Sequence, residues 1–194
     1  MHKPRIAVLV SGRGSHLQAM IDAIDAGRLE AELAGVFSDR PDCPALARAP
    51  APLRWSREAR SYPDRAGFDA ELADAVAARA PDWVVCAGYM RILGNDFVHR
   101  FAGRLLNIHP SLLPKYKGLH THRRALQAGD AEHGASVHWV TPELDGGALI
   151  AQTRIAIEPG DTPEALAARL LPAEHALLQQ VLAEAVAGRL TPPR

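Results

Sequence analysis

The chain has 194 residues and no formal net charge, because 22 lysines and arginines are balanced by 22 aspartates and glutamates. This length suits one α/β domain with a buried core, and the neutral charge without a basic stripe argues against a nucleic-acid partner. No stretch approaches the ~20 apolar residues of a membrane span, so we expect a cytoplasmic protein that binds small molecules, as a monomer or a homodimer.

The first part of the chain alternates short apolar runs with helical patterns, which is typical of βαβ units and a largely parallel sheet. Strands are expected at residues 5–10, 31–38, 52–55, 83–87 and 105–109. Amphipathic helices are expected around residues 17–24, ending at Gly27, and around residues 68–76, ending at Pro81. This part therefore predicts a Rossmann-like sheet.

The second half is more irregular. Residues 110–120 contain two prolines and a glycine and predict a loop, followed by a short helix near residues 123–128. Strands at 136–140 and 149–157 flank a glycine-rich turn at 143–147, which indicates an antiparallel hairpin.

A C-terminal helix completes the predicted elements. Thr162 is its capping residue and Pro163 its first helical residue. The helix is expected to reach about Gly188, with an interruption at Pro172. The fold class is thus α/β, with one domain over residues 1–194, a mostly parallel sheet in its N-terminal half and a hairpin toward its C-terminal half.

A glycine loop follows the first strand. Gly14 and Ser15 lie between strand and helix, so backbone N–H groups and a helix N-terminus meet at one point that suits an anion. The dinucleotide fingerprint would need glycine where Leu17 stands, although Asp39 could serve as a ribose-binding acid. A tight turn without a ligand is the alternative, but Ser15 and Arg13 favour a phosphate monoester.

Asn107 and His109 end a predicted strand two residues apart, so both side chains point to one side while Ile108 points to the core. Pro110 ends the strand and leaves both polar groups at its carboxyl end, where open α/β sheets bind ligands. Either residue alone could instead satisfy loop backbone. Together they can donate hydrogen bonds to an oxygen that becomes negative when an amine attacks a carbonyl carbon.

Asp145 is the candidate partner of this pair. A carboxylate beside an imidazole favours the protonated ring, which is the stronger donor. The glycine-rich turn that carries Asp145 can bring it close to His109, where it could also collect the proton that the amine loses. Taken alone, Asp145 is an ordinary turn residue before glycine.

The cysteines and the remaining histidines are less informative. Cys43 and Cys86 lie far apart without metal-ligand spacing, and Cys86 falls in an apolar run that predicts a buried, inert thiol. We therefore expect no metal. His120 and His138 are second candidates for the acid, although a structural role is favoured for both. Exposed helix or loop positions are expected for His99, His133 and His175.

Four stretches of the chain resemble the phosphoribosylglycinamide formyltransferases, folate-dependent enzymes of purine biosynthesis. They are SGRGSHLQAMIDA near the start, GYMRIL at 88–93, AGRLLNIHPSLLPKYKGLHTHRRALQAGDAEHGASVHWV at 102–140 and ELDGG at 143–147. Together they span nearly the whole chain, and the NIHPSLLPKY…GLHTHRRAL block is highly specific. The resemblance implies formyl transfer from 10-formyltetrahydrofolate, a co-substrate, to the amine of 5'-phosphoribosylglycinamide in de novo purine (IMP) biosynthesis, without a metal.

The resemblance also implies a role for individual residues. Catalytic positions fall on Asn107, His109 and Asp145, with His109 as the proton donor. Contacts to the ribonucleotide fall on Gly14, Ser15, His16 and Glu174. Contacts to folate fall on Arg65, Met90, Arg91, Ile92, Leu93, Asn107, Val140 and Asp145. A phosphate-binding Rossmann-like half, 1–100, and a catalytic and folate-binding half, 101–194, are implied within the single domain.

Three residues depart from the family's pattern. Arg13 and His16 stand where asparagine is usual, and Lys117 stands where proline is usual. The His16 ring can still donate a hydrogen bond and Arg13 adds positive charge, so we expect phosphate binding to survive.

Other functions stay open at this point. A formyltetrahydrofolate hydrolase would use water as the acceptor, but Pro110 directly after His109 and the GLHTH segment fit the ribonucleotide enzymes better. A methionyl-tRNA formyltransferase would need a further C-terminal domain and a basic surface. A non-catalytic folate- or nucleotide-binding protein of this fold would leave the three polar groups without a role. Leu17 disfavours a dinucleotide-dependent oxidoreductase.

Overall fold

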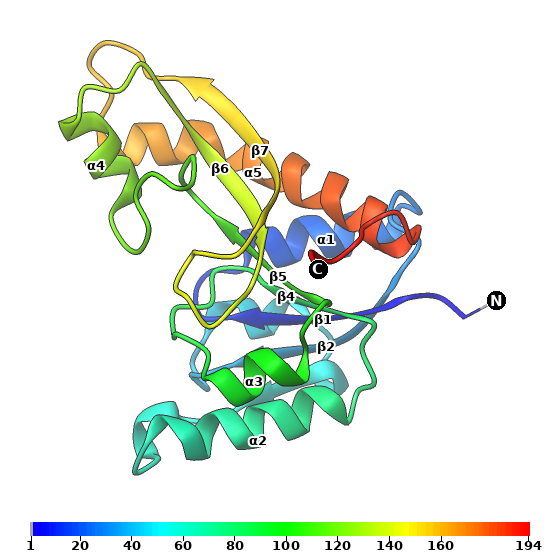
Figure 1. The fold of residues 1–194 in the computed structure, drawn as a ribbon. Helices are drawn as coiled ribbons and strands as arrows, with labels where there is room; N and C mark the ends of the chain where they lie inside the picture. Colours follow the sequence, from blue (N-terminus) through cyan, green and yellow to red (C-terminus); the bar gives the residue numbers. More distant parts are fainter. Residues whose placement is uncertain (1) are drawn as a thin grey trace.

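The sheet is built around β1 (Arg5–Val10), which is buried from Ile6 onward in the computed structural model, where residues 2–194 are described. Seven strands lie in the order β3-β2-β1-β4-β5-β6-β7. The others are β2 (Glu32–Ser38), β3 (Arg54–Ser56), β4 (Trp83–Cys86), β5 (Leu105–His109), β6 (Glu132–Trp139) and β7 (Leu149–Ala156). The strands from β3 to β5 pair in parallel, whereas β6 and β7 are antiparallel to their neighbours (Figure 1).

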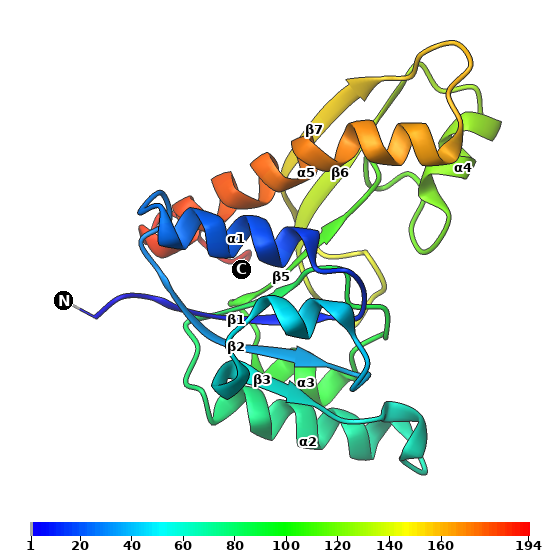
Figure 2. The same cartoon turned by 180° about the vertical axis from the view of Figure 1, so that it is seen from behind.

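Helices cover both faces of the sheet, because successive side chains of a strand point to opposite faces. They are α1 (Ser15–Asp25), α2 (Arg65–Ala77), α3 (Asn95–Arg100), α4 (Thr121–Gln127) and α5 (Pro163–Val186), with short 3₁₀ turns η1 (Pro44–Arg48), η2 (Ala51–Leu53) and η3 (Ala59–Ser61). Val8 of β1 packs in the core layer beneath α1 and α5, and its neighbour Leu9 packs in the layer beneath α2 and α3. Figure 2 shows these two pairs of helices on opposite sides of the strands.

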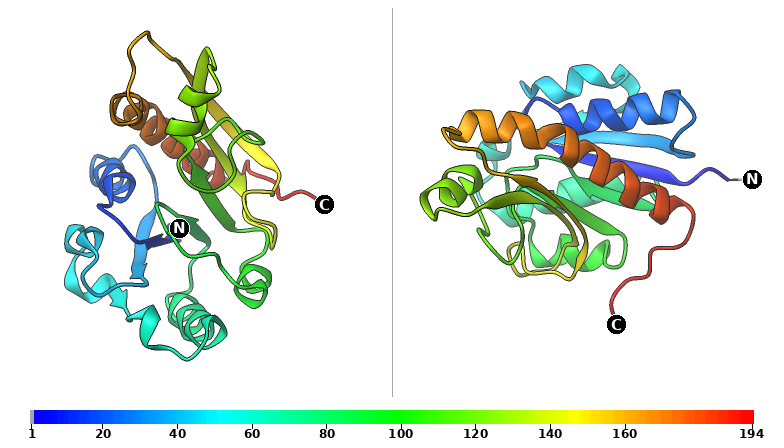
Figure 3. Two further views of the ribbon diagram at one scale, coloured as in Figure 1. Left: turned by 90° about the vertical axis from the view of Figure 1, so that its left-hand side faces the viewer. Right: turned by 90° about the horizontal axis from the view of Figure 1, so that it is seen from above.

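The hairpin of β6 and β7 extends beyond the parallel part of the sheet, with α4 near its far end (Figure 1). Helix α5 lies against α1, α4 and both hairpin strands, and so ties the two parts together (Figure 3). None of the helices within residues 2–194 is long and apolar enough to cross a membrane.

The predicted fold class is confirmed, several element boundaries differ by a few residues, and three differences are larger. Strand β6 begins at Glu132, four residues before the predicted start at 136. Helix α3, which covers only six residues, was not predicted because so short a segment has little periodicity. Helix α5 continues through Pro172, contrary to the expected interruption. Buried leucines on both sides of the proline, Leu170 and Leu177, hold the helix on the core despite the missing hydrogen bond.

Candidate active site

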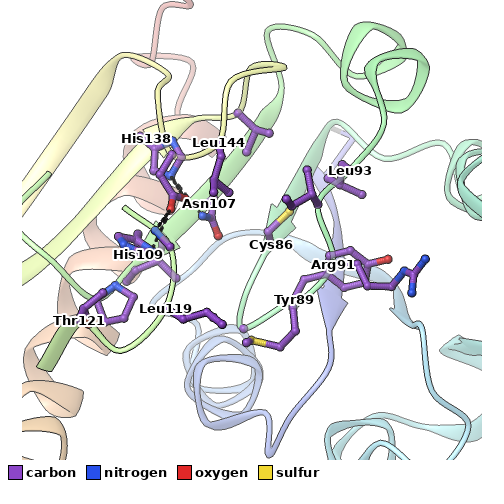
Figure 4. Close-up of a pocket in the computed structure, with 18 of the residues that line it drawn as sticks. Cys86, Tyr89, Arg91, Leu93, Asn107, His109, Leu119, Thr121, His138 and Leu144 are labelled. Atoms are coloured by element: carbon purple, nitrogen blue, oxygen red, sulfur yellow. Dashed lines mark hydrogen bonds and ion pairs between the residues drawn. The ribbon is translucent and has the colours of Figure 1, made fainter. Parts of the chain in front are cut away.

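A cleft of about 770 Å³ opens where β4 and β5 end. The loop after β4, the end of β5, residues 118–122 and the turn at 140–145 line it, and His16 of α1 and Glu174 of α5 also reach it. In Figure 4, Asn107, His109 and His138 lie on one side of the pocket, and Arg91 and Leu93 lie on the facing side. The cleft thus takes residues from both halves of the chain.

His109 is held at the end of β5 with both ring nitrogens near acceptors. Nε2 lies 2.8 Å from the carbonyl oxygen of Tyr116, and because a carbonyl only accepts, Nε2 donates. Nδ1 lies 3.6 Å from Oδ2 of Asp145. Both side chains are more than nine-tenths buried, since 9% of His109 and 7% of Asp145 are exposed. The expected meeting of these two residues is present in the structure.

Asp145 joins two loops that are distant in the sequence. Its Oδ2 accepts a hydrogen bond of 2.8 Å from the Gly118 N–H, and its Oδ1 lies 3.8 Å from Nε2 of His138. The backbone at Asp145 is left-handed, with φ 48°. This conformation turns the carboxylate inward, between the His109 and His138 rings.

His138 orients the amide of Asn107. The two residues face each other in the antiparallel register of β5 and β6. Burial lowers the pKa of His138, so the ring is neutral at pH 7. Its Nδ1 donates to the Trp139 carbonyl at 2.9 Å, which leaves Nε2 to accept from Nδ2 of Asn107 at 3.2 Å. The amide nitrogen of Asn107 therefore faces His138 and keeps a second N–H for another acceptor.

The residues expected to hold a ribonucleotide lie around the start of α1. Gly14 precedes the helix with φ 79°, and a Cβ there would approach the Cβ of Ala45 to 2.5 Å, so only glycine fits. Nε2 of His16 lies 3.6 Å from Oε1 of Glu174, and Oγ of Ser15 lies 3.2 Å from Nε2 of His175. His16 and Glu174 line the cleft, whereas Gly14 and Ser15 do not.

The residues expected to contact folate divide into two groups. Residues 90–93 and Val140 line the cleft, with Met90 64% and Ile92 50% exposed. Arg65 does not line it, and this exposed side chain donates to the Ile92 carbonyl at 3.5 Å. The cleft therefore offers an apolar wall on this side, with Arg65 outside it.

Two histidine predictions were wrong. His133 is buried on β6, where its Nε2 lies 3.0 Å from Nδ1 of His122, and burial lowers its pKa to about 4. His175 is half-buried against Ser15.

His138, expected to be structural, lies inside the cleft. Strand alternation could have indicated this position, because His138 and Val140 are two residues apart on one predicted strand.

Comparisons with known proteins agree with this geometry. The family model described as formyl transferase matches residues 4–182. Phosphoribosylglycinamide formyltransferase of Escherichia coli (strain K12) is 48% identical over 187 residues, which cover 95% of this chain and 88% of the relative. The Haemophilus influenzae protein of the same name is 43% identical over 188 residues, covering 96% and 89%.

Solved structures are similar over the full chain. The phosphoribosylglycinamide formyltransferase from Coxiella burnetii superimposes with a TM-score of 0.93 at 45% identity, covering 100% of this chain and 92% of that one. Glycinamide ribonucleotide transformylase 1 from Symbiobacterium toebii gives a TM-score of 0.94 at 39% identity, covering 99% and 92%.

Proposed function

The chain belongs to the formyl transferase family, and on this premise we propose that Asn107, His109 and Asp145 carry out formyl transfer in the cleft. Its activity is that of a phosphoribosylglycinamide formyltransferase in de novo purine biosynthesis. The donor we assign is 10-formyltetrahydrofolate, the acceptor is the amine of 5'-phosphoribosylglycinamide, and the compartment is the cytoplasm. The approach of the Asp145 carboxylate to the His109 ring, at 3.6 Å beside the cleft, carries this proposal.

His109 is the first donor to the reacting oxygen. Attack of the amine on the formyl carbon places negative charge on the formyl oxygen, and donors must lie where that charge develops. Nε2 donates to a carbonyl, and Nδ1 faces a carboxylate that only accepts, so the geometry suits a ring that carries a proton on each nitrogen. The 3.6 Å between Nδ1 and Asp145 exceeds hydrogen-bond length, which leaves the Nδ1 proton available to the formyl oxygen.

Asn107 and Asp145 complete the reaction scheme. The free N–H of the Asn107 amide is the second donor to the oxyanion. The attacking amine must lose a proton, and the Asp145 carboxylate accepts it directly or through a water molecule. Formyl transfer then leaves the folate nitrogen as the leaving group, which His109 can protonate.

The two substrates are assigned to different groups of residues. The N-terminus of α1 favours the phosphate of the ribonucleotide, with His16 and Glu174 beside it at the cleft. Exposed Met90 and Ile92 offer an apolar wall to the flat folate ring. Phosphate binding thus belongs mainly to residues 1–100 and catalysis to residues 101–194, with folate contacts from both.

A donor-consumption assay tests this function. Purified protein is mixed with 10-formyltetrahydrofolate, with and without glycinamide ribonucleotide, and loss of the formyl donor is followed spectrophotometrically. We expect consumption only when the ribonucleotide is present. Equal consumption without it would identify a hydrolase and overturn the proposal.

Two substitutions test the assigned residues. His109→Ala and Asp145→Asn should each lower kcat by about 10²- to 10³-fold, because an oxyanion donor or the group that charges it is lost. The KM for the folate should change little. His99→Ala, on the exposed end of α3, is the matched control and should retain full activity. Normal turnover of Asp145→Asn would remove that residue from the scheme.

A further inference from the structure

Tyr116 supplies the only contact that His109 Nε2 makes within hydrogen-bond distance among residues 2–194, through its backbone carbonyl. The backbone at Tyr116 is left-handed, with φ 56°. Residues other than glycine, asparagine and aspartate rarely adopt this backbone conformation, so contacts with the surrounding residues must hold Tyr116 in it. The direction of the carbonyl that meets His109 depends on this unusual backbone.

The ring of Tyr116 is held at two places, by Asp130 shortly after α4 and by Arg124 within α4. Its hydroxyl donates to Oδ2 of Asp130 at 2.5 Å, while Lys115 pairs with the other oxygen of Asp130 at 3.2 Å. The guanidinium of Arg124 lies over the ring face, 5.2 Å from its centre. Hydroxyl and ring face are therefore both engaged, and the ring cannot turn without breaking one contact.

Arg124 also fixes the backbone that follows Tyr116, at residues 117–119. Its Nη1 donates to the carbonyl of Lys117 at 2.6 Å and to that of Leu119 at 3.2 Å. Between these carbonyls lies the Gly118 N–H that binds Asp145. One helix thus anchors the loop that meets both His109 and Asp145.

We propose that Tyr116 is a positioning residue for the formyl transfer, whose clamped ring holds its own carbonyl against His109 Nε2. The carbonyl keeps a proton on Nε2 and fixes the ring plane, so that Nδ1 faces Asp145 and the cleft. Asp130 and Arg124 act through Tyr116. This inference rests on the proposed role of His109.

Three variants distinguish the contribution of the Tyr116 ring contacts from that of its left-handed backbone. Tyr116→Ala removes the clamp and disfavours the left-handed backbone, whereas Tyr116→Gly removes the clamp and permits that backbone. Both should lower kcat about 10- to 100-fold, because the imidazole loses its fixed orientation. Tyr116→Phe keeps the stacking on Arg124 and should lose only a few-fold. Substrate KM values should stay within about twofold of the parent in all three.

A matched control is available at a tyrosine that does not line the cleft. Tyr62 also donates its hydroxyl to a carboxylate, that of Glu71, away from the cleft. Tyr62→Phe should therefore keep the parental kcat. Thermal unfolding of each variant identifies any that fails to fold, and Tyr116→Phe then carries the test.

The decisive measurement is a double-mutant cycle with His109. If Tyr116 acts through the imidazole, adding Tyr116→Ala to His109→Ala should cause no further loss of kcat. The imidazole Nε2–H signal of His109, followed by NMR, should shift in Tyr116→Ala. Full kcat in Tyr116→Gly, an additive loss in the double variant, or an unchanged imidazole signal would each overturn the inference. Normal turnover in His109→Ala alone would instead contradict the proposed function.

Discussion

His138 determines which end of the Asn107 amide faces the reacting groups. Its Nδ1 donates to the Trp139 carbonyl, so its Nε2 has a lone pair for the amide N–H. If the amide were reversed, two acceptors would face each other. The orientation of Asn107 as a donor therefore depends on a neutral neighbour, which burial provides by lowering the pKa of His138.

Replacing His138 tests this dependence. His138→Leu removes the acceptor, and we expect kcat to fall about 10-fold, the equivalent of one hydrogen bond of about 1.4 kcal/mol. His138→Gln can place an oxygen near the former Nε2 position and should recover most of the loss. Steady-state kcat of both variants is the measurement, and equal losses would contradict an orienting role.

His16 is a second test at the residue scale. Its Nε2 lies 3.6 Å from Glu174 at the cleft, on the side expected to hold the ribonucleotide. His16→Ala should raise the KM for the ribonucleotide about 10-fold by removing a donor, while the KM for folate stays constant. His16→Asn restores an amide donor and should recover the affinity. A change confined to the KM for folate would place His16 at the folate instead and contradict its assignment to the ribonucleotide.

Lys117, which stands where proline is usual in the family, has a partner in the structure. Its Nζ lies 3.1 Å from Oε1 of Glu143, which belongs to the turn that carries Asp145. The pair links two loops that both contribute lining residues to the cleft. Both side chains are exposed, at 39% and 70%, so we attribute little stability to it.

At the scale of elements, one buried carboxylate joins α2 to the loop expected to bind folate. Asp69 is 5% exposed, and its Oδ2 accepts a hydrogen bond of 2.8 Å from the N–H of Gly94, at the start of α3. A Cβ at Gly94 would lie 2.8 Å from the same oxygen, so glycine is needed for this approach. Burial raises the pKa of Asp69, although Gly94, Arg65 and Arg91 oppose the shift.

Asp69→Asn should reveal the direction of this pKa shift through the pH dependence of the free energy of unfolding. As pH rises above the ordinary value of 3.8, the unfolded carboxyl ionises first, so the parent loses stability until the raised folded pKa is passed. Asparagine keeps an acceptor and does not ionise. The free energy of unfolding of the variant relative to the parent should therefore increase with pH from about 4 and then level off. Urea unfolding over this range would contradict the assignment if the difference stayed constant.

At the scale of the whole molecule, a histidine pair connects the hairpin to α4. His133 of β6 and His122 of α4 lie 3.0 Å apart, and burial followed by the charge of His122 lowers the pKa of His133 from 6.5 to about 4. Below pH 6.5 the unfolded chain takes up the proton first. This pair therefore contributes stability that is lost as pH falls toward 4.

His133→Gln should make the protein less sensitive to acid. The shift in His133 corresponds to an upper limit of about 3.4 kcal/mol, at 1.36 kcal/mol per pKa unit. The free energy of unfolding of the parent should fall more steeply between pH 6.5 and 4 than that of the variant. Parallel curves from urea unfolding would show that His133 ionises equally in both states.

Sequence by itself determined the parallel half of the sheet, the hairpin, and the shared side of Asn107 and His109, because these follow from local periodicity and from the end of a strand. Motif resemblance indicated the reaction. Tertiary structure decided which groups meet: His138 opposite Asn107, the Tyr116 carbonyl on His109, and Arg65 outside the cleft. Strand register creates the first of these contacts and a left-handed turn the second, and neither leaves a periodic pattern in the residues that form it.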